Sequence, residues 1–440
     1  MSESNTNAPI TDLIEELDWR GLIKDCTDQD ALRDHLRTPG RKIYAGFDPT
    51  AESLTIGNLV PIMMLAHVKR AGHVPVVVMG GGTGLIGDPS GKSAERMMMT
   101  VEKVQHHVDC QRPIYENVLG QIEGPEHAIL NNLDWLSGIS YIEALRDIGK
   151  HFSVNMMMQK ESVKERLNNR EQGISYTEFS YMILQAYDFA HLYQHEGVTT
   201  QFGGSDQYGN IVAGGDLIRR TAAMSDEEPA KTFGLTTPLV QKADGGKFGK
   251  TESGAVWLTA AFTSPYAYYQ FWLNASDDDA RNWIKVFTFL PKDEVEALIA
   301  SNDEAPGKRE LQRTLAQQAT TILHGKAAME NAENAGKALF SGDIASLDQE
   351  TLVEVFASVP TTEHNKSQLK GDGVDPMELL KTCNLASSNR EAREFLSTGS
   401  VSINGDKIDG ETKITASHLL HGSFIAIRRG KKKWHLTKWL

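Results

Sequence analysis

Two short segments, far apart in the chain, carry the residue types that phosphate chemistry needs. The first is Gly46-Phe47-Asp48-Pro49-Thr50, followed by the turn Thr55-Ile56-Gly57-Asn58. It joins an apolar strand to the start of a helix, where free backbone N–H groups and the helix dipole attract phosphate. The second, Lys247-Phe248-Gly249-Lys250-Thr251, offers two ammonium groups and a hydroxyl on a loop. Together they predict a nucleotide site that works by positioning and charge.

A second group of polar residues lies on a predicted helix over Thr177–Tyr193. Tyr181, Gln185 and Asp188 are spaced i, i+4 and i+7 among apolar neighbours, so they fall within roughly 60° of one another around the helix axis. Such a stripe is either a solvent face or the wall of a buried polar pocket. It contains no Lys or Glu, and these side chains suit hydrogen bonds to an amine or a hydroxyl. The turn Phe202–Gln207 adds two glycines, an acid and an amide.

Two glycine motifs imitate other nucleotide sites, and both fail in context. Gly82–Gly87 has the spacing of a dinucleotide fingerprint, but Asp88 and Pro89 follow where the phosphate-binding helix should begin. Gly91-Lys92-Ser93 resembles the end of a P-loop, yet Ile86 occupies the position of the first glycine. We therefore reject a dinucleotide site and a P-loop.

The first half of the chain has the pattern of an α/β fold. Residues 1–40 predict an N-terminal helix with a short lead-in. The apolar segments Ile43–Phe47 and Val74–Met79 predict buried strands, and Leu59–Arg70 between them predicts a helix. Strand, helix and strand at this spacing indicate a parallel sheet with helices on its faces, and the alternation continues to about residue 238.

The second half predicts helices, then a small mixed module. Helices are expected over 264–340 and a polar linker over 343–375. Two short helices follow, the second capped at Ser388, and Asn404-Gly405 is a hairpin turn between strands. A basic cluster surrounds Gly430.

Composition and charge limit the class of protein. A chain of 440 residues should form about two to four domains. Three cysteines without a Cys-x-x-Cys pair, a polar N-terminus and no long apolar run predict a soluble cytoplasmic protein. The net charge is −13, but residues 376–440 hold 11 Lys/Arg and 6 Asp/Glu, a balance of +5. The rest therefore carries −18, and the basic tail is either a solvated surface or the contact for a polyanion.

In these motifs the chain resembles bacterial-type tyrosyl-tRNA synthetases over nearly its whole length. The matching segments, in order, are Gly46–Thr50, Gly84–Pro89, Glu178–Tyr181, Gln185–Phe189, Gly203–Gln207 and Lys247–Thr251. The last corresponds to the Lys-Met-Ser-Lys-Ser signature of class I synthetases, and the basic tail resembles the S4 RNA-binding module. One departure is that the His-Ile-Gly-His signature is replaced by Thr55–Asn58.

The resemblance implies a fold and a domain order. A Rossmann-like catalytic domain over 1–240 would be followed by a helical domain with the signature loop over 241–342, the linker over 343–375 and an S4-like α+β domain over 376–440. Relatives are homodimers, and Ile148–Ser153 matches their subunit-interface region.

It also implies a reaction and a role for each site residue. Tyrosine would attack the α-phosphorus of ATP, which arrives with Mg²⁺ and without a resident metal site, and the tyrosyl group would then pass to the 3′ end of tRNA(Tyr). The residues implied in catalysis are Thr50, Thr55, Lys92, Arg96, Lys247, Lys250 and Thr251. Those implied in tyrosine binding are Tyr44, Asp88, Tyr181, Gln185, Asp188 and Gln207. ATP would contact Gly46, Asp48, Gly57, Asn58, Gly204, Asp206 and Lys250. RNA would contact Arg390, Arg393, Arg428, Arg429, Lys431, Lys432 and Lys433.

Three alternatives remain at this point. The related tryptophanyl enzymes share the fold, but they lack the S4 tail and would not need the hydroxyl-binding pair Tyr44 and Asp188. A paralogue that binds RNA but no longer aminoacylates would fit the missing signature histidine, although both loop lysines, Lys247 and Lys250, are present. A stand-alone nucleotide-binding module would leave the basic tail unexplained.

Overall fold

The computed structural model describes residues 10–89, 98–168, 173–224, 231–251, 254–357, 359–430 and 433–440. The chain forms two compact units. The first comprises residues 1–264 and 271–323, and the second comprises 265–270 and 324–440. The expected helical domain over 241–342 is therefore shared between the two units. No helix in the described ranges is long and apolar enough to span a membrane.

The N-terminal segment forms two short helices where we expected one. Helix α1 (Leu13–Trp19) ends at Arg20 and Gly21, and Gly21 has a φ of 74°. This left-handed conformation favours glycine and stops the helix. Strand β1 (Asp25–Cys26) follows, and α2 (Gln29–His35) begins where Asp28 accepts a hydrogen bond from the Ala31 amide.

The first unit is built on a sheet that is parallel except at one edge. Its described strands are β2 (Lys42–Phe47), β3 (Val74–Met79), β4 (Ala128–Asn131), β5 (Val198–Gly204) and β6 (Phe233–Thr237) together with β1. They lie in the order β1-β6-β5-β2-β3-β4, and only the β1–β6 pair of this order is antiparallel. The predicted strands over 43–47 and 74–79 are confirmed.

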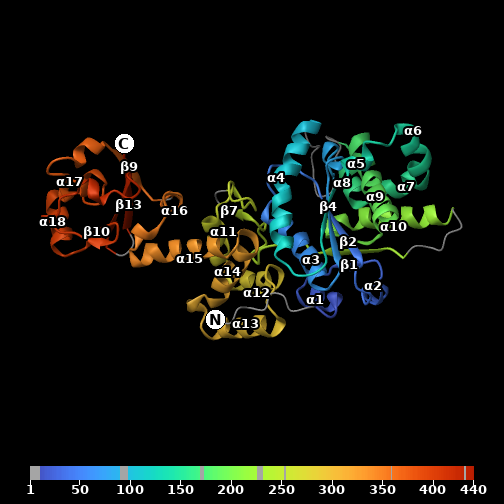
Figure 1. The fold of residues 1–440 in the computed structure, drawn as a ribbon, viewed down its shortest axis with the longest axis horizontal. Coiled ribbons are helices and arrows are strands. Elements are labelled where there is room, and N and C mark those ends of the chain that lie inside the picture. The colour runs from blue at the N-terminus through green and yellow to red at the C-terminus, as the bar shows by residue number, and fades with distance from the viewer. Residues whose placement is uncertain are drawn as a thin grey trace. The chain divides into compact units, whose positions relative to one another are not determined.

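Helices cover both faces of this sheet. The connections from β2 to β3 and from β3 to β4 contain α3 (Leu59–Arg70) and α4 (Val101–Gly120), which pack on each other. The connections from β4 to β5 and from β5 to β6 contain α9 (Tyr176–Glu196) and α10 (Tyr208–Ala222), which also pack together. Because crossovers are right-handed, the two pairs lie on opposite faces, as Figure 1 shows for α4 against α9 and α10. The strand order reverses between β2 and β5, which is where such folds bind ligands.

The remaining elements of the first unit are short or helical. Short helices precede α9: α5 (Leu133–Leu136), α6 (Tyr141–Glu143), α7 (Val154–Met158) and α8 (Glu161–Asn168). A small hairpin of β7 (Lys250–Thr251) and β8 (Gly254–Ala255) is followed by α12 (Asp277–Val286), α13 (Lys292–Glu304) and α14 (Glu310–His324). Helix α11 (Pro265–Leu273) lies between the hairpin and α12, and the boundary between the two units falls within it, after Gln270. The buried guanidinium of Arg20 fastens α1 to the end of α12, because it donates to the carbonyls of Lys285, Thr288 and Leu290 at 2.6–2.8 Å.

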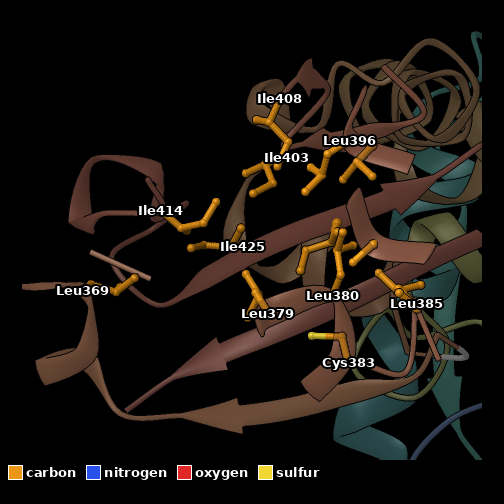
Figure 2. Close-up of a cluster of buried hydrophobic side chains, with 14 of the residues drawn as sticks. Leu369, Leu379, Leu380, Cys383, Leu385, Leu396, Ile403, Ile408, Ile414 and Ile425 are labelled. Carbon is orange, nitrogen blue, oxygen red and sulfur yellow. The ribbon is translucent and has the colours of Figure 1, made fainter. Parts of the chain in front are cut away.

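The second unit contains its own sheet and core. It starts with α15 (Lys326–Ser341) and α16 (Gln349–Val355) and continues with β9 (Thr361–His364), α17 (Pro376–Thr382), α18 (Asn389–Ser397), β10 (Val401–Ile403), β11 (Asp406–Lys407), β12 (Phe424–Arg429) and β13 (Lys433–Trp439). The strand order within the described residues is β11-β10-β12-β13-β9. Leucine and isoleucine side chains from α17, α18 and the sheet meet in one buried cluster (Figure 2).

The linker expected over 343–375 is corrected by these contacts. Strand β9 pairs in parallel with β13, and Leu352, Val355 and Phe356 are buried in a core shared with β12. The segment is polar, but these few apolar residues and the pairing of β9 place it inside the C-terminal unit. The Asn404-Gly405 turn is confirmed: both residues have positive φ, as a tight hairpin requires.

Candidate active site

A pocket of about 450 Å³ opens at the carboxyl ends of β2 and β5, at the point where the strand order reverses. Most of the predicted residues line it: Tyr44, Gly46, Asp48, Thr50, Thr55, Gly57, Asn58, Asp88, Tyr181, Gln185, Asp188, Gly204, Asp206 and Gln207. The polar stripe of α9 is therefore a pocket wall and not a solvent face.

One end of the pocket is suited to bind a hydroxyl group. Tyr44 on β2 is fully buried, and its hydroxyl has no hydrogen-bond partner among the described residues. The carboxylate of Asp188 is also buried, and it accepts hydrogen bonds from Asn132 Nδ2 at 2.9 Å and from Trp135 Nε1 at 2.7 Å. A buried hydroxyl without a partner is costly, and a ligand hydroxyl would satisfy it.

The protonation of these two groups is shifted by burial. Burial raises the pKa of Asp188 to about 7, although the hydrogen bonds from Asn132 and Trp135 favour the charged form. Burial, and then the negative charge of Asp188, raise the pKa of Tyr44 far above its ordinary value. Tyr44 therefore stays a neutral donor, while Asp188 is a carboxylate that changes charge near neutral pH.

The middle of the pocket holds two acids that are fixed by neighbouring side chains. Asp48 accepts hydrogen bonds from the Tyr181 hydroxyl at 3.0 Å and from Thr83 Oγ1 at 2.8 Å. Asp88 accepts one from Gln207 Nε2 at 2.7 Å. Both carboxylates line the pocket, and they give it the negative charge that favours binding of an ammonium group.

Several residues of this network were not predicted from the sequence. Asn132 joins three groups, since its amide accepts from the Gly82 N–H and donates to Thr83 and Asp188. Asn210 on α10 donates to Gln185 and Gln207. An amide one turn beyond Gln207 was a visible signal for Asn210, because i and i+3 share a helix face. Asn132 had no such signal, since only the fold brings it to Asp188.

The turn Thr55–Asn58, where we expected phosphate to bind, is held by its own side chains. Thr55 donates from its backbone N–H and from its hydroxyl to Asn58 Oδ1, at 3.1 and 2.9 Å. This caps the turn that leads into α3, and it commits the hydroxyl hydrogen of Thr55 to a neighbour. Gly57 and Thr50 are exposed at the pocket mouth.

The signature loop packs against this turn, although the two are far apart in sequence. Gly249 has a φ of 75°, and a Cβ there would lie 2.3 Å from Ile56 Cγ2, so only glycine fits. Phe248 lines the pocket and packs against aromatic rings, among them Trp283 on α12 at 5.0 Å and Phe287, directly after α12, at 5.2 Å. The turn Thr55–Asn58 and the loop at Phe248 and Gly249 are therefore in contact, and both contribute to the lining of the same pocket or to its support.

The two loop lysines do not reach the pocket in this structure. Lys247 and Lys250 are exposed and are absent from its lining. Thr251 pairs through its backbone with Gly254, and its side chain is outside the description. Lys92 and Arg96, which we expected to act beside these lysines, lie outside the described residues. In the described ranges no group of three or more His, Cys, Asp and Glu is arranged to hold a metal ion.

The predicted RNA-binding residues of the C-terminal unit differ in exposure. Arg390, Arg393 and Lys433 are exposed. Arg429 is partly occupied within the fold: it donates to the Leu385 carbonyl at 2.6 Å and lies 3.6 Å from the Glu391 carboxylate. The Arg428 guanidinium stacks on the Trp434 ring at 5.1 Å. Lys431 and Lys432 lie outside the described residues.

Two protein families match the chain, one over each part of it. The model for class I tRNA synthetases of the W and Y type matches residues 38–341, and the C-terminal domain model for SYY-like tyrosine–tRNA ligases matches residues 351–437. The chain belongs to the class I tRNA synthetase family. Within that family, the second match begins at α16, which agrees with a C-terminal unit that includes β9.

Individual synthetases are similar over almost the whole chain. The tyrosine–tRNA ligase of Geobacillus kaustophilus is 48% identical over 430 residues, which is 97% of this chain and 100% of the relative. That of Aliivibrio fischeri is 46% identical over 97% of this chain and 99% of its own. Among solved structures, a C-terminally truncated mitochondrial tyrosyl-tRNA synthetase of Aspergillus nidulans matches with a TM-score of 0.68 and 30% identity, covering 75% of this chain and 95% of that one.

Proposed function

We propose that this synthetase is a tyrosine–tRNA ligase, which activates L-tyrosine with ATP and transfers the tyrosyl group to the 3′ end of tRNA(Tyr). The observation that carries the proposal is the buried end of the pocket. There the Asp188 carboxylate lies with the Tyr44 hydroxyl, which has no partner within the described ranges. This pair can bond a phenolic hydroxyl, which tryptophan and phenylalanine lack. The near-complete coverage of curated tyrosine–tRNA ligases supports it.

We assign the tyrosine backbone to the middle of the pocket. Its ammonium would lie against Asp88, Tyr181 and Gln185, and its carboxylate would lie on the side of Gln207. The carboxylate is already ionised at neutral pH, so it can attack the α-phosphorus of ATP without a general base. The protein then accelerates the step by alignment and by stabilising charge on the leaving pyrophosphate.

We assign ATP to the pocket mouth between the two signature segments. Gly46, Gly57 and Gly204 leave room for the adenosine, and Asp206 is exposed where a ribose hydroxyl could bond it. Mg²⁺ would enter as the ATP complex, bound by the phosphates. The ammonium groups of Lys247 and Lys250 would close over the phosphates when the loop moves toward the pocket, with Lys92, Arg96 and Thr251 proposed beside them.

The tRNA is the proposed ligand of the C-terminal unit. Arg390, Arg393 and Lys433 are exposed cations that can meet phosphates, together with the proposed contacts Lys431 and Lys432. Because Arg429 is tied to Leu385 and Glu391, we expect it to support the S4-like unit more than to bind RNA. We place the enzyme in the cytoplasm, where tRNA is charged.

We further propose that the enzyme is a homodimer. Large apolar side chains are exposed on the segment that surrounds Ile148–Ser153: Tyr141, Ile142, Val154 and Met156 are each more than half exposed. Burying these side chains against a second copy of the chain would be favourable in free energy. Sedimentation of the purified chain would show a dimer mass, and Ile142→Asp should shift it toward the monomer. A monomeric wild-type chain would contradict this part of the proposal.

Amino-acid-dependent pyrophosphate exchange tests the function. Exchange should require tyrosine and should be weak with phenylalanine and tryptophan. Charging of tRNA(Tyr) by the same preparation tests the second step. Exchange that is equal with tryptophan, or absent with all three amino acids, would contradict the proposal.

A further inference from the structure

A partly buried lysine, Lys160, lies behind the pocket wall and is not part of the pocket lining. Lys160 follows α7, and its ammonium donates to the Gly209 carbonyl at 2.8 Å and to Asn210 Oδ1 at 3.2 Å. Burial lowers the pKa of Lys160 to about 8, although the carboxylates of Asp88 and Asp216 favour its charge. A lysine in this environment is costly, and its hydrogen bonds must offset that cost.

The ammonium group determines the orientation of the side-chain amide next to it. A lysine ammonium can only donate hydrogen bonds, so the atom of Asn210 that faces it must be the carbonyl oxygen. Asn210 Nδ2 is then turned toward the pocket, where it donates to Gln185 Oε1 at 3.0 Å and to Gln207 Oε1 at 3.3 Å. The orientation of one amide thus determines those of two more.

The last link of this chain reaches the charged part of the pocket. With its Oε1 turned to Asn210, Gln207 presents Nε2 to Asp88 Oδ2 at 2.7 Å and to Asp206 Oδ2 at 3.1 Å. If Asn210 were reversed, its carbonyl would face two carbonyl oxygens, and both glutamines would have to reverse. Gln207 would then direct its carbonyl at the Asp88 carboxylate, and this contact is repulsive.

We propose that Lys160 is a positioning residue that sets the orientation of Asn210, Gln185 and Gln207, and thereby prepares the part of the pocket that receives the ammonium and carboxylate of the amino acid. The inference rests on the proposed function, because Gln185, Gln207 and Asp88 are assigned there to the tyrosine backbone. Lys160 does not line the pocket and takes no part in the chemistry.

Removing the ammonium group is the first test. In pyrophosphate exchange with the full chain, Lys160→Met should raise the KM for tyrosine about tenfold, because a charge-assisted hydrogen bond and the orientation it sets are lost. The KM for ATP should change much less, by about twofold, because Asp206 is the one residue assigned to ATP that this network reaches, through the 3.1 Å bond from Gln207. Lys160→Arg, which also only donates, should retain most of the affinity for tyrosine.

Lys164→Met is the matched control. Lys164 lies one turn further along the same segment, is exposed, and has no side-chain contact with the network among the described residues. The Lys164→Met variant loses the same charge as Lys160→Met but leaves the network intact, so its KM for tyrosine should stay at the wild-type value. An equal rise in both methionine variants would mean that only net charge matters, and it would overturn the proposal.

Asn210→Asp separates orientation from simple support. An aspartate at position 210 would form an ion pair with Lys160, so the melting temperature should hold or rise. It can no longer donate to Gln185 and Gln207, so the KM for tyrosine should still rise about tenfold. A wild-type KM in this variant would overturn the inference while leaving the ligase assignment intact. A wild-type chain without tyrosine-dependent exchange would instead refute the proposed function.

Discussion

The buried hydroxyl of Tyr44 allows a prediction in which stability and function change in opposite directions. In the free protein this hydroxyl is fully buried and has no partner among the described residues. Tyr44→Phe removes the unsatisfied group and keeps the ring, which packs against Phe189 at 5.4 Å. The free protein should therefore gain stability. In the complex, the phenolic hydroxyl of tyrosine should lose one of its two proposed partners and keep Asp188.

The two effects have comparable sizes. Leaving a buried donor unpaired costs about 1–3 kcal/mol, so Tyr44→Phe should raise the free energy of unfolding by about 1 kcal/mol. Loss of one neutral hydrogen bond to the ligand costs about 1 kcal/mol, which is roughly a fivefold loss of tyrosine affinity. Phenylalanine makes no such bond. The preference for tyrosine over phenylalanine should therefore fall by roughly the same factor.

Tyr115→Phe provides the matched control. Tyr115 is also fully buried, and its hydroxyl has no partner in the described part of the chain. It packs on Phe47 and lies outside the pocket lining. Thermal melting should show a similar increase in stability for both variants. In pyrophosphate exchange, only Tyr44→Phe should show a lower preference for tyrosine over phenylalanine. Unchanged tyrosine-to-phenylalanine selectivity in Tyr44→Phe would refute the assignment of the hydroxyl site.

Three further predictions concern the phosphate turn and the C-terminal unit. Thr55→Ala should reduce the rate of tyrosyl-adenylate formation less than Lys250→Ala, because the Thr55 hydroxyl already donates to its neighbour; stopped-flow rates with the order reversed would contradict this. Removal of residues 343–440 should leave pyrophosphate exchange close to the wild-type rate and strongly reduce tRNA charging, with a shallower salt dependence of tRNA binding; undiminished charging would exclude the tail as the RNA anchor. Burial lowers the pKa of His435, so on acidification the unfolded chain takes up a proton before the folded chain does. The free energy of unfolding should therefore decrease as the pH drops below about 6.5. In His435→Gln, the difference between the melting temperatures at pH 5 and pH 7 should be smaller than in the wild type. An equal difference in the two proteins would contradict this prediction.

The local sequence determined the elements that frame the site. Apolar runs predicted β2 and β3, the segment between them predicted α3, and the motifs at Gly46–Thr50 and Lys247–Thr251 marked two segments near the pocket. These signals are local, because strand burial and tight turns depend on neighbouring residues. The charge of residues 376–440 likewise marked a separate module. Polar residues on α9 were recognisable, but the sequence left open whether they faced solvent or a pocket.

Only the tertiary structure decided which of these groups meet. Strand β9 joined the C-terminal sheet because its partner is β13, a pairing between distant segments that local polarity concealed. Asn132 reached Asp188 because β4 ends beside α9, and Lys160 reached Asn210 because the segment after α7 packs on the start of α10. A hydrogen bond depends on distance and direction in space, and residues dozens of positions apart acquire both only when the chain is folded.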